Sequence, residues 1–344
     1  MKRHGNTLFV TSQGSYLNKE GECVCISVER QEKGRIPVHN LEGVVCFGQV
    51  SVSPFLLGHL AEKGVTLTFM TEYGKFLARL EGPVSGNVLL RKEQYRRADD
   101  QLSSARLASG FLLGKIANSR TVLMRAARDH GEDGCGEQLR ESARRLGDCI
   151  RRLLCDGLGL DTLRGIEGEA AASYFGVFQN MITNDCQEFT FRLRSRRPPL
   201  DRVNCLLSFL YSLLLHDARS ALEMVGLDPA VGFLHRDRPG RPSLALDLME
   251  ELRPVLADRL ALTLINRQEL KAGDFIIAES GAVTMTDEAR KALLIAWQNK
   301  KQQEMTHPFL QETVTLGSLC RLQAMLLARH VRGDLDGYPP FLYR

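Results

Sequence analysis

The sequence lacks long apolar runs, and it carries little excess of either charge. No window of its 344 residues approaches the ~20 consecutive apolar residues that a membrane-spanning helix requires. The first residues, MKRHGNTLFV, do not begin the uninterrupted apolar core of a secretory signal. A formal net charge of only +4 does not by itself indicate a nucleic-acid ligand. These absences predict a cytoplasmic protein without a membrane partner, whose ligands have to be sought in local patterns.

Paired cysteines are also missing. The nine cysteines, an odd number, are scattered along the chain, and no CxxC pair occurs. This argues against a zinc ribbon and against a thioredoxin-type redox motif. We expect reduced and mostly buried thiols, as in other cytosolic proteins.

The first 82 residues contain little helical periodicity. Short segments rich in β-branched and aromatic residues alternate with turn residues. One stretch, residues 54–63, instead has helical spacing, with Pro54 suited to a first helical position. The sequence therefore predicts a small β-sandwich-like domain with one short helix. The expected strands cover residues 7–11, 15–19, 23–29, 34–38, 44–47, 66–70 and 75–80.

The remainder of the chain has the composition of long helices. A linker is predicted at residues 83–87, and from residue 88 the sequence is dense in Leu, Ala, Arg and Gln. The fold class is therefore α+β, with the β domain at residues 1–82 and a larger all-α domain at 88–344. The aromatic and proline-rich tail, Tyr338–Tyr343, either docks on a partner or covers its own helices. Helices are expected within 88–157 and over 167–183, 201–225, 243–266, 286–301 and 314–332, with a small hairpin within 273–285.

The segment from Gly226 to Pro254 holds a candidate metal site. His235 ends an apolar, turn-rich stretch, and a helix follows with Ser243 as its expected N-cap. On that helix Asp247 and Glu250 are three residues apart, so they share a face with Cβ atoms roughly 5–6 Å apart. Two carboxylates beside an imidazole suit a divalent ion. From spacing alone, a solvated acidic face with a hydrogen-bonded loop histidine explains the same residues.

A second candidate carboxylate is Glu167, which lies between Gly165 and Gly168. The glycines are expected to let the backbone pack closely around it. An Ala-rich, helix-forming segment follows, so the alternative is a glutamate at a helix N-terminus, where the helix dipole favours a negative charge.

Several separated motifs together resemble one family. LRGIEGEAAxxYF, PPLDRVNCLLSFLY, GLDPxxGFLH and SLALDLMEELRP follow one another in the order found in the Cas1 family, the metal-dependent integrases of CRISPR spacer acquisition. The GFLHRDR and YPPFLY segments resemble subtype I-C members. The resemblance implies an N-terminal β domain used for dimerisation and a helical, catalytic and DNA-binding C-terminal domain.

The resemblance also implies the site. Glu167, His235 and Glu250 match the metal ligands of the family, with Asp247 as a nearby acid. Many members carry aspartate where this chain has Glu250, so Asp247 remains an alternative third ligand. We favour Glu250, with Asp247 supporting the site. Such ligands suit Mg²⁺ or Mn²⁺, and the imidazole favours Mn²⁺.

The implied reaction is the joining of DNA. The 3′-hydroxyl of a captured double-stranded DNA fragment attacks a phosphodiester at the edge of a CRISPR repeat, and the enzyme works as a homodimer with a Cas2 partner protein. The same residues also suffice for a general metal-dependent nuclease without integration. A catalytically silent DNA-binding scaffold is the third alternative.

Clustered arginines supply candidate DNA contacts. They lie in the segment Phe189–Arg202 and just after His235, and each arginine taken singly is equally compatible with a solvated surface. Asn204, Ser208 and Tyr211 match the middle block of the family at helical spacing and could face the site; Tyr211 is as readily explained by helix packing. The candidate DNA contacts are Arg192, Arg194, Arg196, Arg197, Arg236, Arg238 and Arg241.

Overall fold

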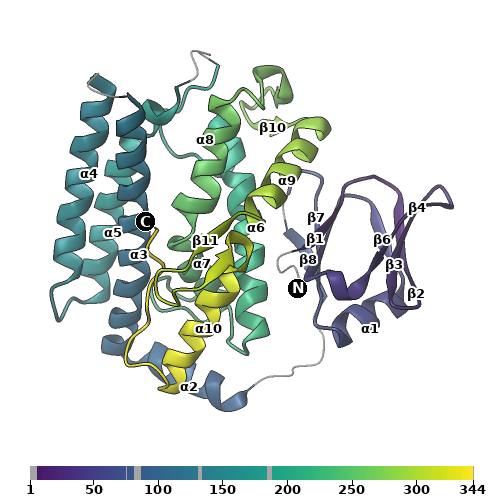
Figure 1. Ribbon diagram of the computed structural model, residues 1–344, viewed down its shortest axis with the longest axis horizontal. Helices are drawn as coiled ribbons and strands as arrows, with labels where there is room; N and C mark the ends of the chain where they lie inside the picture. Colours follow the sequence, from purple (N-terminus) through teal and green to yellow (C-terminus); the bar gives the residue numbers. More distant parts are fainter. Residues whose placement is uncertain (1–5, 75, 81–86, 131–133, 184–187, 344) are drawn as a thin grey trace. The chain divides into compact units, whose positions relative to one another are not determined.

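The computed structural model describes residues 6–74, 76–80, 87–130, 134–183 and 188–343 (Figure 1). The chain divides into two compact units. The first comprises the described residues of Met1–Ser85, Arg290–Glu304 and Thr315–Ser318, and the second those of Gly86–Ala289, Met305–Val314 and Leu319–Arg344. The domain limits expected from the sequence remain a prediction, and residues 83–86 of the expected linker lie outside the described residues.

The first unit contains two four-stranded sheets. One has the order β1-β5-β7-β8, in which β5 pairs in parallel with both β1 and β7, and β8 is antiparallel to β7. The other has the order β4-β3-β2-β6, with antiparallel pairs except for the parallel pair of β2 and β6. The strands are β1 (Thr7–Val10), β2 (Ser15–Glu20), β3 (Cys23–Val28), β4 (Gln31–Pro37), β5 (Gly43–Phe47), β6 (Val50–Val52), β7 (Thr66–Met70) and β8 (Phe76–Arg79).

One apolar cluster fills the core of this unit. Leu17 and Val24 from one sheet and Val44 from the other are fully buried in it. Leu56 and Leu60 of α1 (Pro54–Glu62) join the same cluster. As the sequence predicts, Pro54 occupies the first turn of this helix, and the Ser53 hydroxyl accepts a hydrogen bond from the Leu56 N–H at 3.3 Å. The predicted strands are confirmed within a few residues, whereas the short strand β6 was not predicted.

Three long helices of the second unit lie side by side (Figure 1). They are α3 (Gln101–His130), α4 (Gly134–Leu153) and α5 (Leu160–Gly176), and each packs against the other two. Apolar residues recur every three or four positions on the facing sides, as in Leu139, Ala143 and Leu146 of α4, which are all buried.

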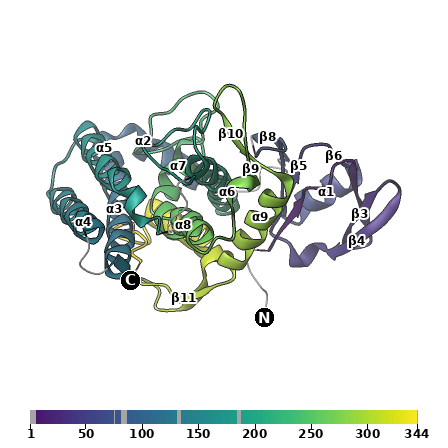
Figure 2. The same cartoon turned by 90° about the horizontal axis from the view of Figure 1, so that it is seen from above.

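Another long helix of the second unit, α6 (Arg202–Met224), is buried along much of its length. The Asp201 carboxylate caps its first turn by accepting the Asn204 N–H at 2.7 Å. It packs against α7 (Ser243–Glu250), α8 (Arg259–Asn266) and α10 (Leu319–Arg332), and Figure 2 shows α7 and α8 beside it. The remaining elements are α2 (Val88–Asp99), α9 (Asp287–Lys301), the pairs β9 (Phe275–Ile277) with β10 (Val283–Met285) and β11 (Glu304–Thr306) with β12 (Thr313–Thr315), and the 3-10 helices η1 (Val38–Asn40), η2 (Phe178–Met181), η4 (Ala272–Asp274) and η5 (Leu316–Ser318).

The helix predicted over residues 243–266 is interrupted, which corrects the prediction. The helix α7 ends at Glu250, a π-helical turn η3 (Arg253–Asp258) follows, and α8 begins at Arg259. Pro254 explains the break, because it has no N–H to donate to the carbonyl of residue 250. The expected N-cap was also wrong: Pro242 holds that position, and the buried Ser243 donates its hydroxyl to the Arg236 carbonyl at 3.2 Å.

The helix α5 starts seven residues earlier than predicted, so Glu167 lies inside it rather than at its start. The close packing expected around Gly165 and Gly168 is absent, since a Cβ built on either glycine has no neighbour within 4 Å. The last helix was predicted from residue 314 but starts at Leu319, because residues 313–315 form β12.

The carboxy-terminal tail covers helices of its own unit, which is one of the two alternatives left open by the sequence. Tyr338 and Phe341 are buried, and the ring of Tyr338 lies 5.0 Å from that of Phe111 on α3. Among the described residues, no helix combines the length and the apolar character that crossing a bilayer requires.

Candidate active site

Two glutamates from different helices meet at one lysine. Lys115 of α3 forms an ion pair with Glu167 of α5, and its Nζ lies 2.9 Å from Oε2 of Glu250 at the end of α7. Glu250 is buried, whereas the side chain of Glu167 retains 33% exposure. The three side chains thus place two negative charges and one positive charge together, with one side open to solvent.

His235 is held beside this group by Asp247. The ring nitrogen Nδ1 of His235 lies 2.5 Å from Oδ1 of Asp247, and Nε2 lies 3.9 Å from Oε1 of Glu250. Because an ionised carboxylate only accepts hydrogen bonds, Nδ1 carries the proton in this contact. The lone pair of a neutral ring is then on Nε2, which is the nitrogen nearer to Glu250.

Asp247 also fixes the loop that carries His235. Its carboxylate is fully buried and accepts the backbone N–H groups of Phe233, Leu234 and His235 at 2.7, 3.0 and 3.0 Å. Gly232 is required here, because a Cβ at this position would lie 2.7 Å from the Cβ of Ser243 and 2.9 Å from Oδ2 of Asp247. With both oxygens occupied by the loop, Asp247 is a support for the imidazole.

Helix α5 is tied to the same loop. The guanidinium of Arg164, one turn before Glu167, donates from Nε and Nη2 to the Leu234 carbonyl at 3.1 and 3.0 Å. This contact fixes the position of the Glu167 helix relative to the His235 loop. Glu167 and His235, which are far apart in the sequence, are thereby held on segments that contact each other.

The charge of Glu250 is compensated from two sides. Burial alone would raise the pKa of this carboxyl, but Arg253, at 2.7 Å from Oε1, and Lys115 outweigh it and lower the pKa to about 2. Burial also opposes the charged form of Lys115, yet Glu250 and Glu167 together raise its pKa. Glu250 and Lys115 are therefore both ionised at neutral pH.

The donor set fits a divalent ion. It offers carboxylate oxygens from Glu167 and Glu250 and the imidazole Nε2 of His235, oriented by a carboxylate on its other nitrogen. One oxygen, Oε2 of Glu250, is buried without a well-directed hydrogen bond, although Lys115 provides a charge near it. A carboxylate oxygen in this state is available as a ligand.

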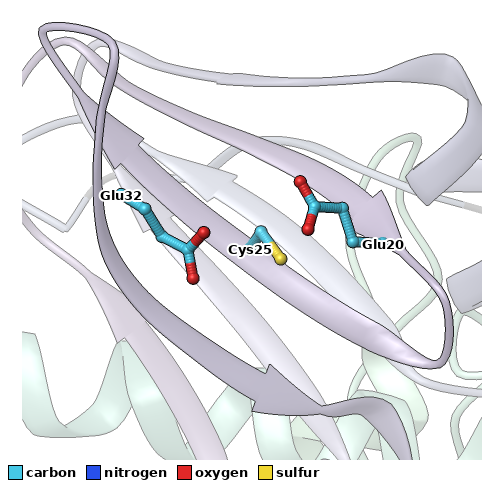
Figure 3. Close-up of side chains that lie close together, drawn as sticks. All are labelled: Glu20, Cys25 and Glu32. Carbon is cyan, nitrogen blue, oxygen red and sulfur yellow. The ribbon is translucent and has the colours of Figure 1, made fainter.

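A different acidic cluster is tighter but less suitable. Among the described residues, only Glu20, Cys25 and Glu32 place three possible ligand atoms within 4.8 Å of one another (Figure 3). The guanidinium of Arg35 pairs with Glu20 at 2.5 Å and with Glu32 at 3.1 Å, and burial raises the pKa of the Cys25 thiol. One guanidinium pairs with both carboxylates, which remain half exposed, and the cluster contains no imidazole, so it is an ordinary cross-strand ion-pair group.

The middle block of the sequence holds an arginine in place. Asn204 accepts the Arg194 Nη1 at 2.6 Å, and the Ser208 hydroxyl accepts both terminal nitrogens of Arg194 at 3.2 Å. The guanidinium carbons of Arg194 and Arg253 lie 5.2 and 5.0 Å from the centre of the Tyr211 ring. Tyr211 thus contacts Arg253, which in turn pairs with Glu250. Asn204 and Ser208 hold Arg194 through hydrogen bonds.

The predicted DNA-contacting arginines differ in exposure. Five of them are exposed, and one of these, Arg236, pairs with Asp161 at 3.2 Å. The other two, Arg194 and Arg241, are partly buried. The aromatic side chains Phe189 and Phe191, which alternate with arginines in the sequence, are buried. The exposed five are Arg192, Arg196, Arg197, Arg236 and Arg238.

Sequence reasoning missed the two cations of the site. Arg253 follows Glu250 by three residues, so helical spacing was a signal that would have found it. Lys115 gave no such signal, because it is one basic residue in a long helix and lies 52 positions before Glu167.

Comparisons with known proteins agree on one family. The family model described as "CRISPR associated protein Cas1" matches residues 8–299. A curated relative from Chlorobaculum tepidum, "CRISPR-associated endonuclease Cas1 1", is 60% identical over 344 residues and covers 100% of both chains.

Solved structures share the fold. A CAS1 protein from Thermotoga maritima has a TM-score of 0.79 at 23% identity and covers 97% of this chain and 98% of its own. A casposase bound to integration product has a TM-score of 0.80 at 21% identity, with coverage of 98% and 94%. A chain of a Cas6-RT-Cas1–Cas2 complex has a TM-score of 0.81 at 20% identity, with coverage of 98% and 36%.

Proposed function

Because this chain belongs to the Cas1 family of CRISPR-associated proteins, we propose that it joins captured DNA to a CRISPR repeat with Glu167, His235 and Glu250 as its metal-binding residues. Family membership makes it an endonuclease of CRISPR adaptation. The residue roles, the metal and the partners are the parts that we propose. The casposase of the same fold, bound to integration product, supports joining as well as cutting.

The observation that carries the proposal is the meeting of three separated motifs. The Glu167 carboxylate on α5 and the Glu250 carboxylate on α7 both contact Lys115, and the His235 imidazole on the loop approaches the other oxygen of Glu250. Glu167, His235 and Glu250 each belong to a sequence block that resembles the Cas1 family. A buried carboxylate that faces the free nitrogen of an imidazole, with a second carboxylate held close by through the same lysine, is an arrangement typical of functional sites.

The proposed ion is Mg²⁺ or Mn²⁺. Hard carboxylate oxygens suit both ions, and the imidazole favours Mn²⁺. When bound, a divalent ion supplies positive charge that stabilises the phosphate in the transition state and favours the ionised form of an attacking hydroxyl. Glu167, Glu250 and the Nε2 of His235 hold it, and Asp247 supports His235 rather than serving as the third ligand.

The remaining residues orient the site and the DNA. Asp247 keeps the His235 proton on Nδ1, so that Nε2 is free to bind. The exposed arginines around residues 192–197 and 236–238 bind backbone phosphates, and Arg194, held by Asn204 and Ser208, positions that segment. A 3′-hydroxyl of the captured fragment then attacks a repeat phosphodiester, and the leaving 3′-oxygen of the repeat takes up a proton. The number of phosphodiester bonds is unchanged, so no external energy source is needed.

The proposed assembly follows the family. We propose a homodimer formed through the N-terminal β unit, working in the cytoplasm with a Cas2 partner on double-stranded DNA. The solved Cas6-RT-Cas1–Cas2 complex, one chain of which shares this fold, supports the Cas2 partner. The GFLHRDR and YPPFLY segments favour subtype I-C.

A strand-transfer assay tests this function. A labelled DNA fragment with free 3′-hydroxyls is mixed with a supercoiled plasmid that carries a repeat, in Mn²⁺, with and without Cas2. Wild type should give covalently joined product, and Glu167→Gln should lower the rate at least ~1,000-fold, roughly 4 kcal/mol of transition-state stabilisation. Glu169→Gln is the matched control, since Glu169 is exposed on the same helix and pairs with Arg152 at 2.6 Å.

Each alternative function has its own outcome. Cutting without joining, even with Cas2 present, indicates a general metal-dependent nuclease. DNA binding without any turnover indicates a scaffold. Equal loss in Glu167→Gln and Glu169→Gln would place the active site elsewhere.

A further inference from the structure

Lys115 occupies the centre of the proposed site. Its side chain is 13% exposed and lies between the carboxylates of Glu167 and Glu250, which come from different helices. Within the described part of the chain, Lys115 is the ion-pair partner of Glu167, whereas Glu250 has a second cationic partner in Arg253. No sequence block that resembles the family includes this lysine.

The ammonium group of Lys115 compensates the negative charges of Glu167 and Glu250. Two carboxylates brought together in a partly buried site repel each other, and a charge removed from water needs a compensating partner. An ammonium group in contact with both supplies it. A divalent ion seeks the same oxygen atoms, and two cations at this spacing repel each other strongly even at an effective dielectric constant of about 20.

We propose that Lys115 is a positioning residue that acts as an internal counter-cation, holding Glu167 and Glu250 in the metal-free enzyme until a divalent ion displaces it. This inference rests on the proposed function, because it takes both glutamates as metal ligands. Metal binding is then an exchange of cations. The affinity for the ion is lower than the two carboxylates and the imidazole would give without the lysine, and the metal-free protein is more stable in return.

The test measures Mn²⁺ binding by the full chain, with free Mn²⁺ followed by electron paramagnetic resonance. Lys115→Met, which removes the charge and keeps most of the volume, should lower the Kd for Mn²⁺ at least about tenfold. Lys115→Arg should stay within about threefold of wild type, because it restores a cation. Arg120→Met, at an exposed arginine on the same helix, should also stay within about threefold, which controls for the loss of one positive charge.

Thermal unfolding provides a second readout. Mn²⁺ should raise the Tm of Lys115→Met more than that of wild type, since the variant starts from unopposed carboxylates. Lys115→Gln serves as a second variant, with hydrogen-bond donors but no charge, and should show the same direction. If both neutral variants fold only with Mn²⁺ present, the ion has replaced the lysine, and the proposal stands. If the ion cannot restore either fold, the proposal fails.

The controls separate this inference from the function on which it rests. Glu167→Gln and His235→Ala should weaken Mn²⁺ binding. If they do, but Lys115→Met binds Mn²⁺ with unchanged or weaker affinity, Lys115 is not a competing cation and only this inference is overturned. If Glu167→Gln and His235→Ala bind Mn²⁺ as wild type does, the metal site itself is wrong.

Discussion

Glu250 and Glu251 are neighbours in the chain and both are buried, yet they lie in opposite electrostatic surroundings. Glu250 faces the cations Lys115 and Arg253. Glu251 faces neutral donors: the Tyr338 hydroxyl, the Gln323 amide at 3.0 Å and the Phe341 N–H at 2.7 Å. Each carboxylate thus has several partners, and the partners differ in charge.

The two pKa values show what this difference means. Burial is the largest influence on both groups and raises both values. Arg253 and Lys115 overcome it and bring the pKa of Glu250 to about 2, whereas the hydrogen bonds to Glu251 leave its pKa at about 7. Direct cations therefore compensate a buried carboxylate, and hydroxyl and amide donors do so only in part. Glu250, with its cationic partners, belongs to the proposed active site. Glu251, with its neutral partners, fixes the carboxy-terminal tail.

Isosteric neutralisation of the two neighbours gives the largest expected contrast. Glu250→Gln should lower strand joining at least ~1,000-fold, because it removes the charge of a proposed metal ligand. Glu251→Gln should lower it less than about tenfold, but should reduce the free energy of unfolding by about 1–3 kcal/mol, since its amide group replaces one acceptor by a donor. Joining rates and urea unfolding of both variants make the measurement. If Glu251→Gln folded but were as inactive as Glu250→Gln, the two glutamates could not be assigned to separate roles in catalysis and in fixing the tail.

Asp258 sharpens the comparison through pH. This carboxylate is buried, accepts the hydroxyls of Tyr174 and Tyr211 at 3.0 and 2.7 Å, and feels Arg194 and Arg253 only at longer range. Burial raises its pKa from 3.8 to about 6, although the hydrogen bonds oppose the rise. A folded pKa above the unfolded one means that the folded chain binds the extra proton, so this contribution to stability is full below pH ~4 and is lost as pH rises to ~6.

The variant Asp258→Asn removes this proton uptake. The difference in unfolding free energy between the variant and wild type should shift in favour of the variant by about 2 kcal/mol between pH 4 and pH 6.5. Urea unfolding at several pH values measures it, and subtracting wild type cancels the other carboxylates. A constant difference across this range would show that Asp258 titrates alike in both states.

The sequence indicated the residues of the proposed site more readily than the residues that support them. Glu167 and His235 stand in local patterns that resemble a family, and an i, i+3 pair on a helix places Asp247 and Glu250 on one face. The role of Asp247 could not be predicted from the sequence. Asp247 accepts hydrogen bonds from three backbone N–H groups of an irregular loop, and the spacing of side chains does not determine the direction of the backbone in such a loop. Lys115 depends on a contact between distant segments.

The fold class was predicted because the two halves of the chain differ in periodicity. Errors occurred where one residue overrides a pattern. Pro254 ends α7 although the apolar spacing continues to residue 266, and this break was readable from the missing proline N–H. The start of α5 at Leu160 was harder to predict, because Gly165 and Gly168 lower the helix propensity of this segment.

A substitution at Gly114 perturbs the surroundings of Glu251 without touching those of Glu250. It has the smallest expected effect on stability. A Cβ on Gly114 of α3 would lie 2.8 Å from the Cβ of Glu251, 2.9 Å from its Oε2 and 3.3 Å from the Cβ of Pro340. Gly114→Ala should therefore cost about 1–2 kcal/mol of unfolding free energy through overpacking. Gly165→Ala is the matched control, because a Cβ there meets nothing within 4 Å and should stabilise its helix by about 0.5–1 kcal/mol. Opposite signs in urea unfolding would show that close packing against Glu251 and the tail, rather than helix propensity, requires glycine at position 114; equal signs would show that the tail yields to the added methyl group.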